Sequence, residues 1–185
     1  MIMFDTDKGK TLLHLARAAI AGELGFISHD LPRTGWLEEP GATFVTLTLH
    51  DQLRGCIGSL EARRSLLEDV RANAVAAAFR DPRFTPLGKE EFAKVVIEVS
   101  LLSPPQPIDF TSEQDALAQL DPGLDGVILE YGMHRATYLP QVWAQLSDPR
   151  SFIEHLKAKA GLPEDFWSDD IKLSRYRVQK FEEVV

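Results

Sequence analysis

The residues best suited to chemistry stand together in the segment Leu53–Gly58, which reads LRGCIG. Its thiol, Cys56, stands between two glycines in a strand-like stretch, where glycine normally weakens a strand. Glycines in such a place indicate a bulge, a bend or a close approach of the backbone to another group. Arg54 would favour the thiolate, the reactive form of cysteine, and its planar fork suits a carboxylate or a phosphate. We therefore predict that Arg54, Gly55 and Gly58 bind substrate beside Cys56.

Nucleophilic catalysis by Cys56 needs a base or a cation that activates the thiol. His50 is expected across a hairpin from Cys56, and Glu98 is expected on the polar side of a later strand, where burial would suit it to general-base catalysis. Cys56, Glu98 and His50 are therefore the candidate catalytic residues. The alternatives are that Cys56 is a small buried side chain and that Glu98 pairs with a basic residue across the sheet. Arg54 and Cys56 share a face of the strand only if no bulge lies between them.

No metal site or cofactor is predicted. The sequence contains no HEXXH, CxxC or EF-hand pattern and no pair of histidines at helical ligand spacing. His29, His50 and Cys56 are a set that folding could bring together around a metal. The chain also lacks GxGxxG and the phosphate-binding GxxxxGK[ST], so neither type of nucleotide-cofactor site is expected.

A second candidate region is Asp81-Pro82-Arg83-Phe84. Asp81 could orient Arg83 and present its guanidinium to an anionic ligand, so Arg83 is a further predicted substrate-binding residue. The alternative is the end of a helix with Arg83 in a structural ion pair. Six arginines and four acidic residues lie between Arg54 and Arg83, whereas the whole chain has a net charge of −8. This local excess favours a small anionic ligand and is too small for extended nucleic-acid binding.

The elements that must position these residues follow from periodicity and capping signals. Thr43–His50 alternates as a half-buried strand, and Asp51-Gln52 makes a turn into Leu53–Gly58, so a hairpin is predicted. Ser65 and Glu68 have capping-box spacing at the start of an alanine-rich helix that ends near Arg80. The other predicted elements are a helix over Asp5–Glu23, a loop over Phe26–Ala42, a strand over Lys94–Leu102, a helix over Thr111–Leu120, a hairpin of Val127–Tyr131 and Arg135–Leu139, a helix from Asp148-Pro149 to near Gly161, and a strand within Ile171–Phe181. Hairpins interspersed with helices favour an α+β fold with a mainly antiparallel sheet flanked by helices.

The LRGCIG hexapeptide resembles the signature of the AMMECR-type domain family, also called AmmeMemoRadiSam system protein A. The resemblance continues in order over about residues 10–183, in FVTLTL before the hexapeptide, DPRF at 81–84, IEVS at 97–100, Leu139-Pro140, KAGL at 159–162 and the region from Tyr176 to Glu182. It implies a single AMMECR-type domain over residues 1–185, with a larger and a smaller lobe and a cleft between them near the signature. It also implies a Memo-type protein and a radical-SAM protein as partners, and it assigns no activity. Members often carry a second cysteine just before KAGL, where this chain has Lys157-Ala158, so the resemblance does not extend to a two-thiol redox mechanism.

Composition bounds the remaining possibilities. The chain has 185 residues, 44% hydrophobic and 26% charged, with 20 basic and 28 acidic side chains. These values are ordinary for a globular protein, and the acidic balance argues against general nucleic-acid coating. The single cysteine allows no internal disulfide and no cysteine-rich zinc site. With no signal peptide and no membrane span expected, the prediction is a cytoplasmic protein.

Three functions remain open at this stage. We rank first an accessory component that binds a small anionic ligand in a cleft and acts with Memo-type and radical-SAM partners, because spacing alone assembles no complete catalytic set. The alternative is a cysteine-dependent enzyme acting on a small anionic substrate through Cys56, with Arg54 as the anion clamp and Glu98 or His50 as the proton-transfer partner. A second alternative, an RNA-interacting factor, depends on the arginine-rich stretch alone.

Overall fold

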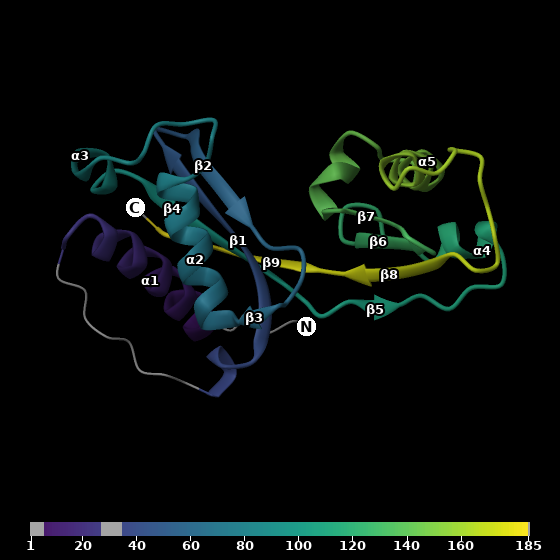
Figure 1. Cartoon of the computed structure of the whole chain (residues 1–185), viewed down its shortest axis with the longest axis horizontal. Helices are drawn as coiled ribbons and strands as arrows, with labels where there is room; N and C mark the ends of the chain where they lie inside the picture. The colour runs from purple at the N-terminus through teal and green to yellow at the C-terminus, as the bar shows by residue number, and fades with distance from the viewer. Residues whose placement is uncertain (1–5, 27–34, 185) are drawn as a thin grey trace. The chain divides into compact units, whose positions relative to one another are not determined.

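The computed structural model describes residues 6–26 and 35–184. They belong to two compact units (Figure 1), of which unit 1 contains the chain before Ser103 together with its end from Gln179, and unit 2 is Ser103–Val178. Each unit combines helices with an antiparallel sheet. The α+β fold predicted from the sequence is therefore confirmed.

Unit 1 is built on a sheet with the strand order β2-β1-β4-β9, in which β3 also pairs with β1. Its elements are α1 (Thr6–Glu23), the 3-10 helix η1 (Gly35–Leu37), β1 (Pro40–Leu49), β2 (Gln52–Gly58), β3 (Arg64–Ser65), α2 (Leu66–Phe79), α3 (Lys89–Phe92), β4 (Val96–Leu102) and β9 (Val178–Glu182).

The β1–β2 hairpin forms because β1 alternates between two environments. Val45 and Leu47 are fully buried in the core, whereas Thr46, between them, points to the opposite face. His50 and Asp51 make the two-residue turn, with φ angles of 50° and 60°. Positive φ at both central positions suits the right-handed twist of the flanking strands, and Asp and His tolerate this conformation better than most residues.

Helix α2 begins where its cap predicts. The Ser65 Oγ accepts a hydrogen bond from the Glu68 backbone N–H at 3.3 Å, and the first helical residue is Leu66. Val70, Ala74 and Ala77 form its buried face, and small residues there let the helix lie close to the strands. Figure 1 shows α1 and α2 over the same sheet, and their buried residues share one core with those of β1 and β4.

Unit 2 has a sheet with the strand order β5-β8-β6-β7. Its core includes Phe152 and Trp143, whose rings stack with centroids 3.8 Å apart. The Asp148 carboxylate accepts the Ser151 N–H and caps α5 as predicted. The elements are β5 (Gln106–Pro107), α4 (Glu113–Ala118), β6 (Gly126–Tyr131), β7 (His134–Tyr138), the 3-10 helix η2 (Pro140–Ala144), α5 (Pro149–Lys159) and β8 (Lys172–Tyr176).

The final segment differs from the prediction of one strand within Ile171–Phe181. The structure has two strands there, because the chain leaves the sheet of unit 2 after Tyr176 and enters the sheet of unit 1 at Val178. Two short strands that face different cores cannot share one alternating pattern, which accounts for the poor periodicity of this segment.

The predicted loop over Phe26–Ala42 and the expected absence of a membrane span can be compared with the described residues. The predicted loop Phe26–Ala42 contains η1 and the start of β1, while residues 27–34, with His29, lie outside the described residues. Within the described ranges, each helix is too short or too polar to span a bilayer.

Candidate functional site

A bulge in β2 decides where Cys56 points. Leu53 pairs with Thr48 and Gly55 pairs with Leu47, so Arg54 is an extra residue without a partner in β1. In an unbroken hairpin Cys56 would face Val45 and the core. The extra residue shifts the register by one, which moves a side chain to the other face of a sheet. Cys56 is therefore opposite Thr46, on the face away from α1 and α2.

Asp81 and Arg83 hold the backbone of Cys56 at the open edge of β2. The Cys56 N–H donates to Asp81 Oδ2 at 2.9 Å, and Arg83 Nη2 donates to the Cys56 carbonyl oxygen at 3.3 Å. Asp81 also accepts from Arg83 Nε at 3.0 Å and from Arg83 Nη2 at 2.7 Å. The two side chains thus occupy both backbone groups that a neighbouring strand would use.

The electrostatics of this pair leave a cation at the surface. The Arg83 guanidinium is the main cause that holds the pKa of the Asp81 carboxyl well below its usual range, and the backbone N–H groups of Cys56 and Arg83 add to the effect. The Asp81 side chain is only 2% exposed, whereas that of Arg83 is 53% exposed. Arg83 is therefore fixed by a buried carboxylate but remains open to solvent, as the sequence-based prediction of an oriented guanidinium requires.

The Arg54 side chain is bonded to another part of unit 1 and not to the Cys56 side chain. The bulge directs its side chain to Glu91, which accepts from Nε at 2.8 Å and from Nη2 at 3.0 Å, and Nη2 also donates to the Thr85 carbonyl at 2.9 Å. The hydrogen bond from Arg54 lowers the pKa of Glu91 to about 2, with help from the Gly88 N–H. With its side chain only 11% exposed, Arg54 joins β2 to the segment around α3. The structure does not bring its guanidinium together with the Cys56 side chain, and its role in ligand binding stays a prediction.

Gly55 and Gly58 are required by close packing. A Cβ on Gly55 would stand 2.1 Å from the Ala77 carbonyl oxygen of α2, and a Cβ on Gly58 would stand 2.2 Å from Cγ of Phe44. At Gly55 the neighbour is backbone, so a side chain is excluded there, whereas a side chain at Gly58 would require the Phe44 ring to shift. Both glycines therefore let β2 approach a helix on one face and an aromatic ring on the other, and contact with a ligand stays a prediction for both.

The Cys56 side chain belongs to a row of polar groups across the sheet. The Thr46 hydroxyl donates to Cys56 Sγ at 3.3 Å, and Thr46 stands opposite Glu98 on its other side. Lys180 Nζ contacts the Glu98 carboxylate at 3.2 Å, which is the cross-strand pairing considered as the alternative for Glu98. Glu98 and Cys56 share a face but are two strands apart, about 10 Å at the usual strand spacing.

The histidines do not join this row. His50 lies in the hairpin turn, four residues along β1 from Thr46, or about 13 Å at the rise of a strand. It is therefore not beside Cys56, and His29 lies outside the described residues. Across residues 6–26 and 35–184, no group of three or more His, Cys, Asp or Glu side chains is placed to hold a metal ion.

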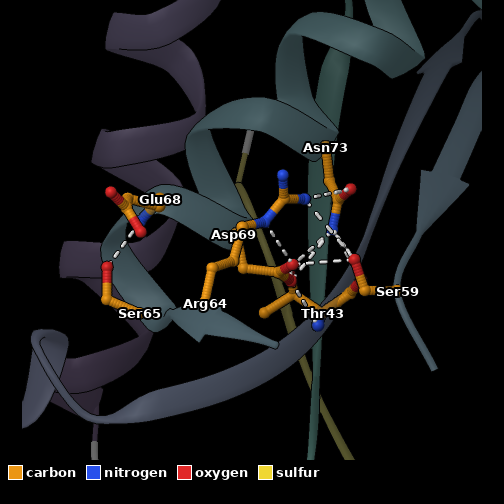
Figure 2. A network of polar contacts seen from close by, with 7 residues as sticks. All are labelled: Thr43, Ser59, Arg64, Ser65, Glu68, Asp69 and Asn73. Atoms are coloured by element: carbon orange, nitrogen blue, oxygen red, sulfur yellow. Dashed lines mark hydrogen bonds and ion pairs between the residues drawn. The ribbon is translucent and has the colours of Figure 1, made fainter. Parts of the chain in front are cut away.

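A buried network that sequence reasoning missed fixes the chain after the LRGCIG segment (Figure 2). Asp69, 1% exposed, accepts from the Ser59 hydroxyl at 2.7 Å, from Thr43 N at 2.8 Å and from Arg64 Nε at 2.9 Å. Asn73, one turn later, donates to Asp69 at 2.9 Å and to the Thr43 carbonyl at 3.0 Å. The available signal was a polar pair at i, i+4 spacing on the apolar face of α2.

Thr46 was also missed as a site residue. Counting back from the predicted turn at Asp51-Gln52 without a bulge pairs Thr46 with Ile57. The turn at His50-Asp51 and the extra residue in β2 together bring Thr46 opposite Cys56. Lys180, which contacts Glu98 across 82 residues of sequence, left no local signal.

Comparison with known proteins shows the family to which the chain belongs. A family model described as AMMECR1 matches residues 13–181. The chain belongs to the AMMECR1 family. The predicted membership of the AMMECR-type domain family is therefore confirmed, and the matched residues include Cys56, Arg83 and Glu98.

Relatives match nearly the whole length of this chain. Protein MJ0810 of Methanocaldococcus jannaschii is 36% identical over 191 residues, covering 100% of this chain and 94% of the relative. A protein of Methanothermobacter thermautotrophicus is 36% identical over 96% of this chain and 95% of its own length. The crystal structure of the uncharacterized protein PH0010 from Pyrococcus horikoshii has a TM-score of 0.74 and 35% identity, covering 95% of this chain and 91% of that one.

Proposed function

We propose that this AMMECR1-family protein is a binding component that takes a small anionic ligand at the surface formed by Arg83, Cys56 and Thr46. The observation that carries the proposal is the state of Arg83. A guanidinium has five N–H donors, and the bonds to Asp81 and to the Cys56 carbonyl use Nε and Nη2. Nη1 has no hydrogen bond to the described residues, and the side chain is 53% exposed. The protein thus fixes the guanidinium and leaves donors for a carboxylate or a phosphate.

Binding is favoured over catalysis by what surrounds the thiol. Among the described residues, Cys56 Sγ accepts from the Thr46 hydroxyl, and no histidine or carboxylate bonds it. Glu98 is two strands away and already pairs with Lys180. General acid-base catalysis needs a group within hydrogen-bond reach of the proton that moves. The row supplies recognition groups but no base next to the sulfur.

The arginine-rich stretch gives no support to RNA binding. Four of its six arginines are engaged by acidic side chains, namely Arg54 by Glu91, Arg63 by Glu61, Arg64 by Asp69 and Arg83 by Asp81. Ion pairing therefore lowers the net charge of the stretch and leaves the free donors of Arg83 for one small anion, whereas affinity for RNA would require many cations to neutralise successive phosphates.

The test is a titration with inorganic phosphate and with acetate, followed by NMR through the backbone amides of Cys56 and Arg83. We expect Arg83→Gln to abolish the response, and Cys56→Ser to retain it, because the sulfur is not the anion-binding group. Arg71→Gln is the matched control, since Arg71 is an exposed arginine on α2, which packs on the face of the sheet opposite to the Cys56 side chain. Equal responses from Arg83→Gln and wild type would remove the basis of the proposal.

The accessory role is a further part of the proposal. The resemblance to AmmeMemoRadiSam proteins suggests that the bound ligand is used together with a Memo-type and a radical-SAM partner. Co-expression of this chain with the Memo-type and radical-SAM proteins of its own genome, followed by size-exclusion chromatography, tests this. Elution of each protein alone at micromolar concentration, with and without phosphate, would contradict a stable complex.

A cysteine-dependent enzyme is the second candidate, and the Thr46–Cys56 hydrogen bond is the observation that favours it. A hydroxyl that donates to the sulfur orients the atom that would act as the nucleophile. The enzyme hypothesis predicts that iodoacetamide alkylates Cys56 faster than it alkylates N-acetylcysteine at neutral pH, that Thr46→Val slows the reaction and that Thr46→Ser preserves it. A rate below that of N-acetylcysteine, unchanged in Thr46→Val, would exclude an activated thiol.

A further inference from the structure

The polar row defined above continues beyond the anion-binding residues. From the open edge of β2 inward it consists of Arg83, Cys56, Thr46, Glu98 and Lys180. Cys56, Thr46 and Glu98 are direct cross-strand partners, so they stand side by side on one face. The row therefore begins with a cation, continues through neutral polar groups to the Glu98 carboxylate, and ends with Lys180, which pairs with that carboxylate.

The carboxylate end can accept a different partner. Glu98 is 23% exposed and Lys180 is 58% exposed, and their contact at 3.2 Å is a solvent-exposed ion pair. Such pairs contribute little stability, because water screens the charges and two side chains must be held in place. A second bond to Glu98, from Ser100 at 3.3 Å, keeps the carboxylate in position when Lys180 moves away. An external ammonium group could therefore replace Lys180 without disturbing the core.

We propose that the ligand of this surface is an extended zwitterion, which places its anionic group on Arg83 and its ammonium group on Glu98. The middle of the ligand lies over Cys56 and Thr46. This inference rests on the proposed function, since it adds the second charge and the length to the anion that Arg83 binds.

The length of the ligand follows from the sheet. Glu98 is two strand spacings from Cys56, and Arg83 lies about one spacing outside β2, so the two protein charges are about 14 Å apart. Each charge-assisted contact takes up about 3 Å of this span. The charged groups of the ligand are then about 8–10 Å apart, which is close to the end-to-end length of an extended tripeptide. Triglycine is a suitable probe because it has both charges, the required length and no side chain.

The experiment compares three probes on the wild-type full chain by isothermal titration calorimetry. They are triglycine, N-acetyl-triglycine, which lacks the ammonium, and triglycine amide, which lacks the carboxylate. We expect triglycine to bind at least about tenfold more tightly than either derivative, since each has lost one charge-assisted contact. Because this comparison uses only the wild type, it does not depend on any variant folding.

Two variants identify the residues. Glu98→Gln should greatly reduce the preference for triglycine over N-acetyl-triglycine, because the neutral amide offers the ammonium a hydrogen-bond acceptor but no negative charge. Lys180→Met should tighten triglycine binding by about two- to threefold, because it removes the competing internal cation. Lys94→Met is the control for loss of a lysine, since Lys94 is an exposed residue just before β4.

The outcomes separate the two proposals. If N-acetyl-triglycine binds as tightly as triglycine and Arg83→Gln abolishes both, the anion site stands and the zwitterion inference is overturned. If phosphate binds at Arg83 but none of the three triglycine probes binds, the anion site again stands and the zwitterion inference is overturned. If Arg83→Gln leaves phosphate and triglycine binding unchanged, both proposals fail.

Discussion

Replacing Asp81 with alanine should lower the free energy of unfolding by about 3 kcal/mol. The Asp81 side chain is 2% exposed and accepts hydrogen bonds from the Cys56 N–H, the Arg83 N–H and two nitrogen atoms of the Arg83 guanidinium. The largest contribution is the Cys56 N–H, which loses its charged acceptor and costs about 1–3 kcal/mol if it stays buried and unpaired. Arg83 is half exposed, so its release into water adds little.

The assay is urea unfolding followed by tryptophan fluorescence, together with amide hydrogen exchange at Cys56. We expect the Asp81→Ala midpoint to fall, exchange at Cys56 to accelerate, and Asp81→Asn to lie between this variant and wild type, because its carbonyl oxygen still accepts from the Cys56 N–H. Glu90→Ala, at an exposed position of α3, is the control. A loss below about 1 kcal/mol, with unchanged exchange at Cys56, would show that Asp81 does not hold the edge of β2.

Gly55→Ala should destabilise the protein by several kcal/mol in thermal unfolding, because the new Cβ would stand 2.1 Å from the Ala77 carbonyl oxygen. Gly22→Ala is the control and should be neutral or stabilising, because a Cβ at this helical position meets open space. Asp69→Ala should cost about 3–5 kcal/mol in urea unfolding, because it leaves the buried donors around it unpaired. The pKa of Glu91 is lowered to about 2, so its stabilising effect is complete above pH 4.5 and is lost as the pH falls toward 2. When the pH falls from 4.5 toward 2, the free energy of unfolding should therefore decrease less in Glu91→Gln than in wild type, as measured by urea unfolding at each pH.

Local patterns were enough to predict most of the elements around the site. The alternation of β1, the cap at Ser65 and the proline after α2 each depend on a few neighbouring residues, so they can be read from the sequence. The β1–β2 hairpin was predicted with its turn at Asp51-Gln52, whereas the structure has the turn one residue earlier, at His50-Asp51. The same logic placed Asp81 close enough to Arg83 to orient it, and the structure has this contact.

What the sequence could not provide was register and distant pairing. Two glycines indicated a bulge near Cys56, but not that Arg54 is the extra residue, and that choice determines the face on which the sulfur lies. The partner of Arg54 is Glu91, 37 residues away, and the partner of Glu98 is Lys180. Such contacts are set by how separate elements pack, so the spacing of residues in the chain carries no trace of them.

The two side chains that cover the edge of β2 also affect how molecules of this protein meet one another. An uncovered strand offers its peptide groups to any other chain in an extended conformation, and merging of sheets at such borders leads to aggregation. Asp81 and Arg83 occupy the peptide groups of Cys56, which lies within that border. Lateral addition of a foreign strand would have to displace a buried, charged acceptor. A molecule that contacts Cys56 would therefore meet its side chain on the face of the sheet that Thr46 shares, and not its peptide groups at the border.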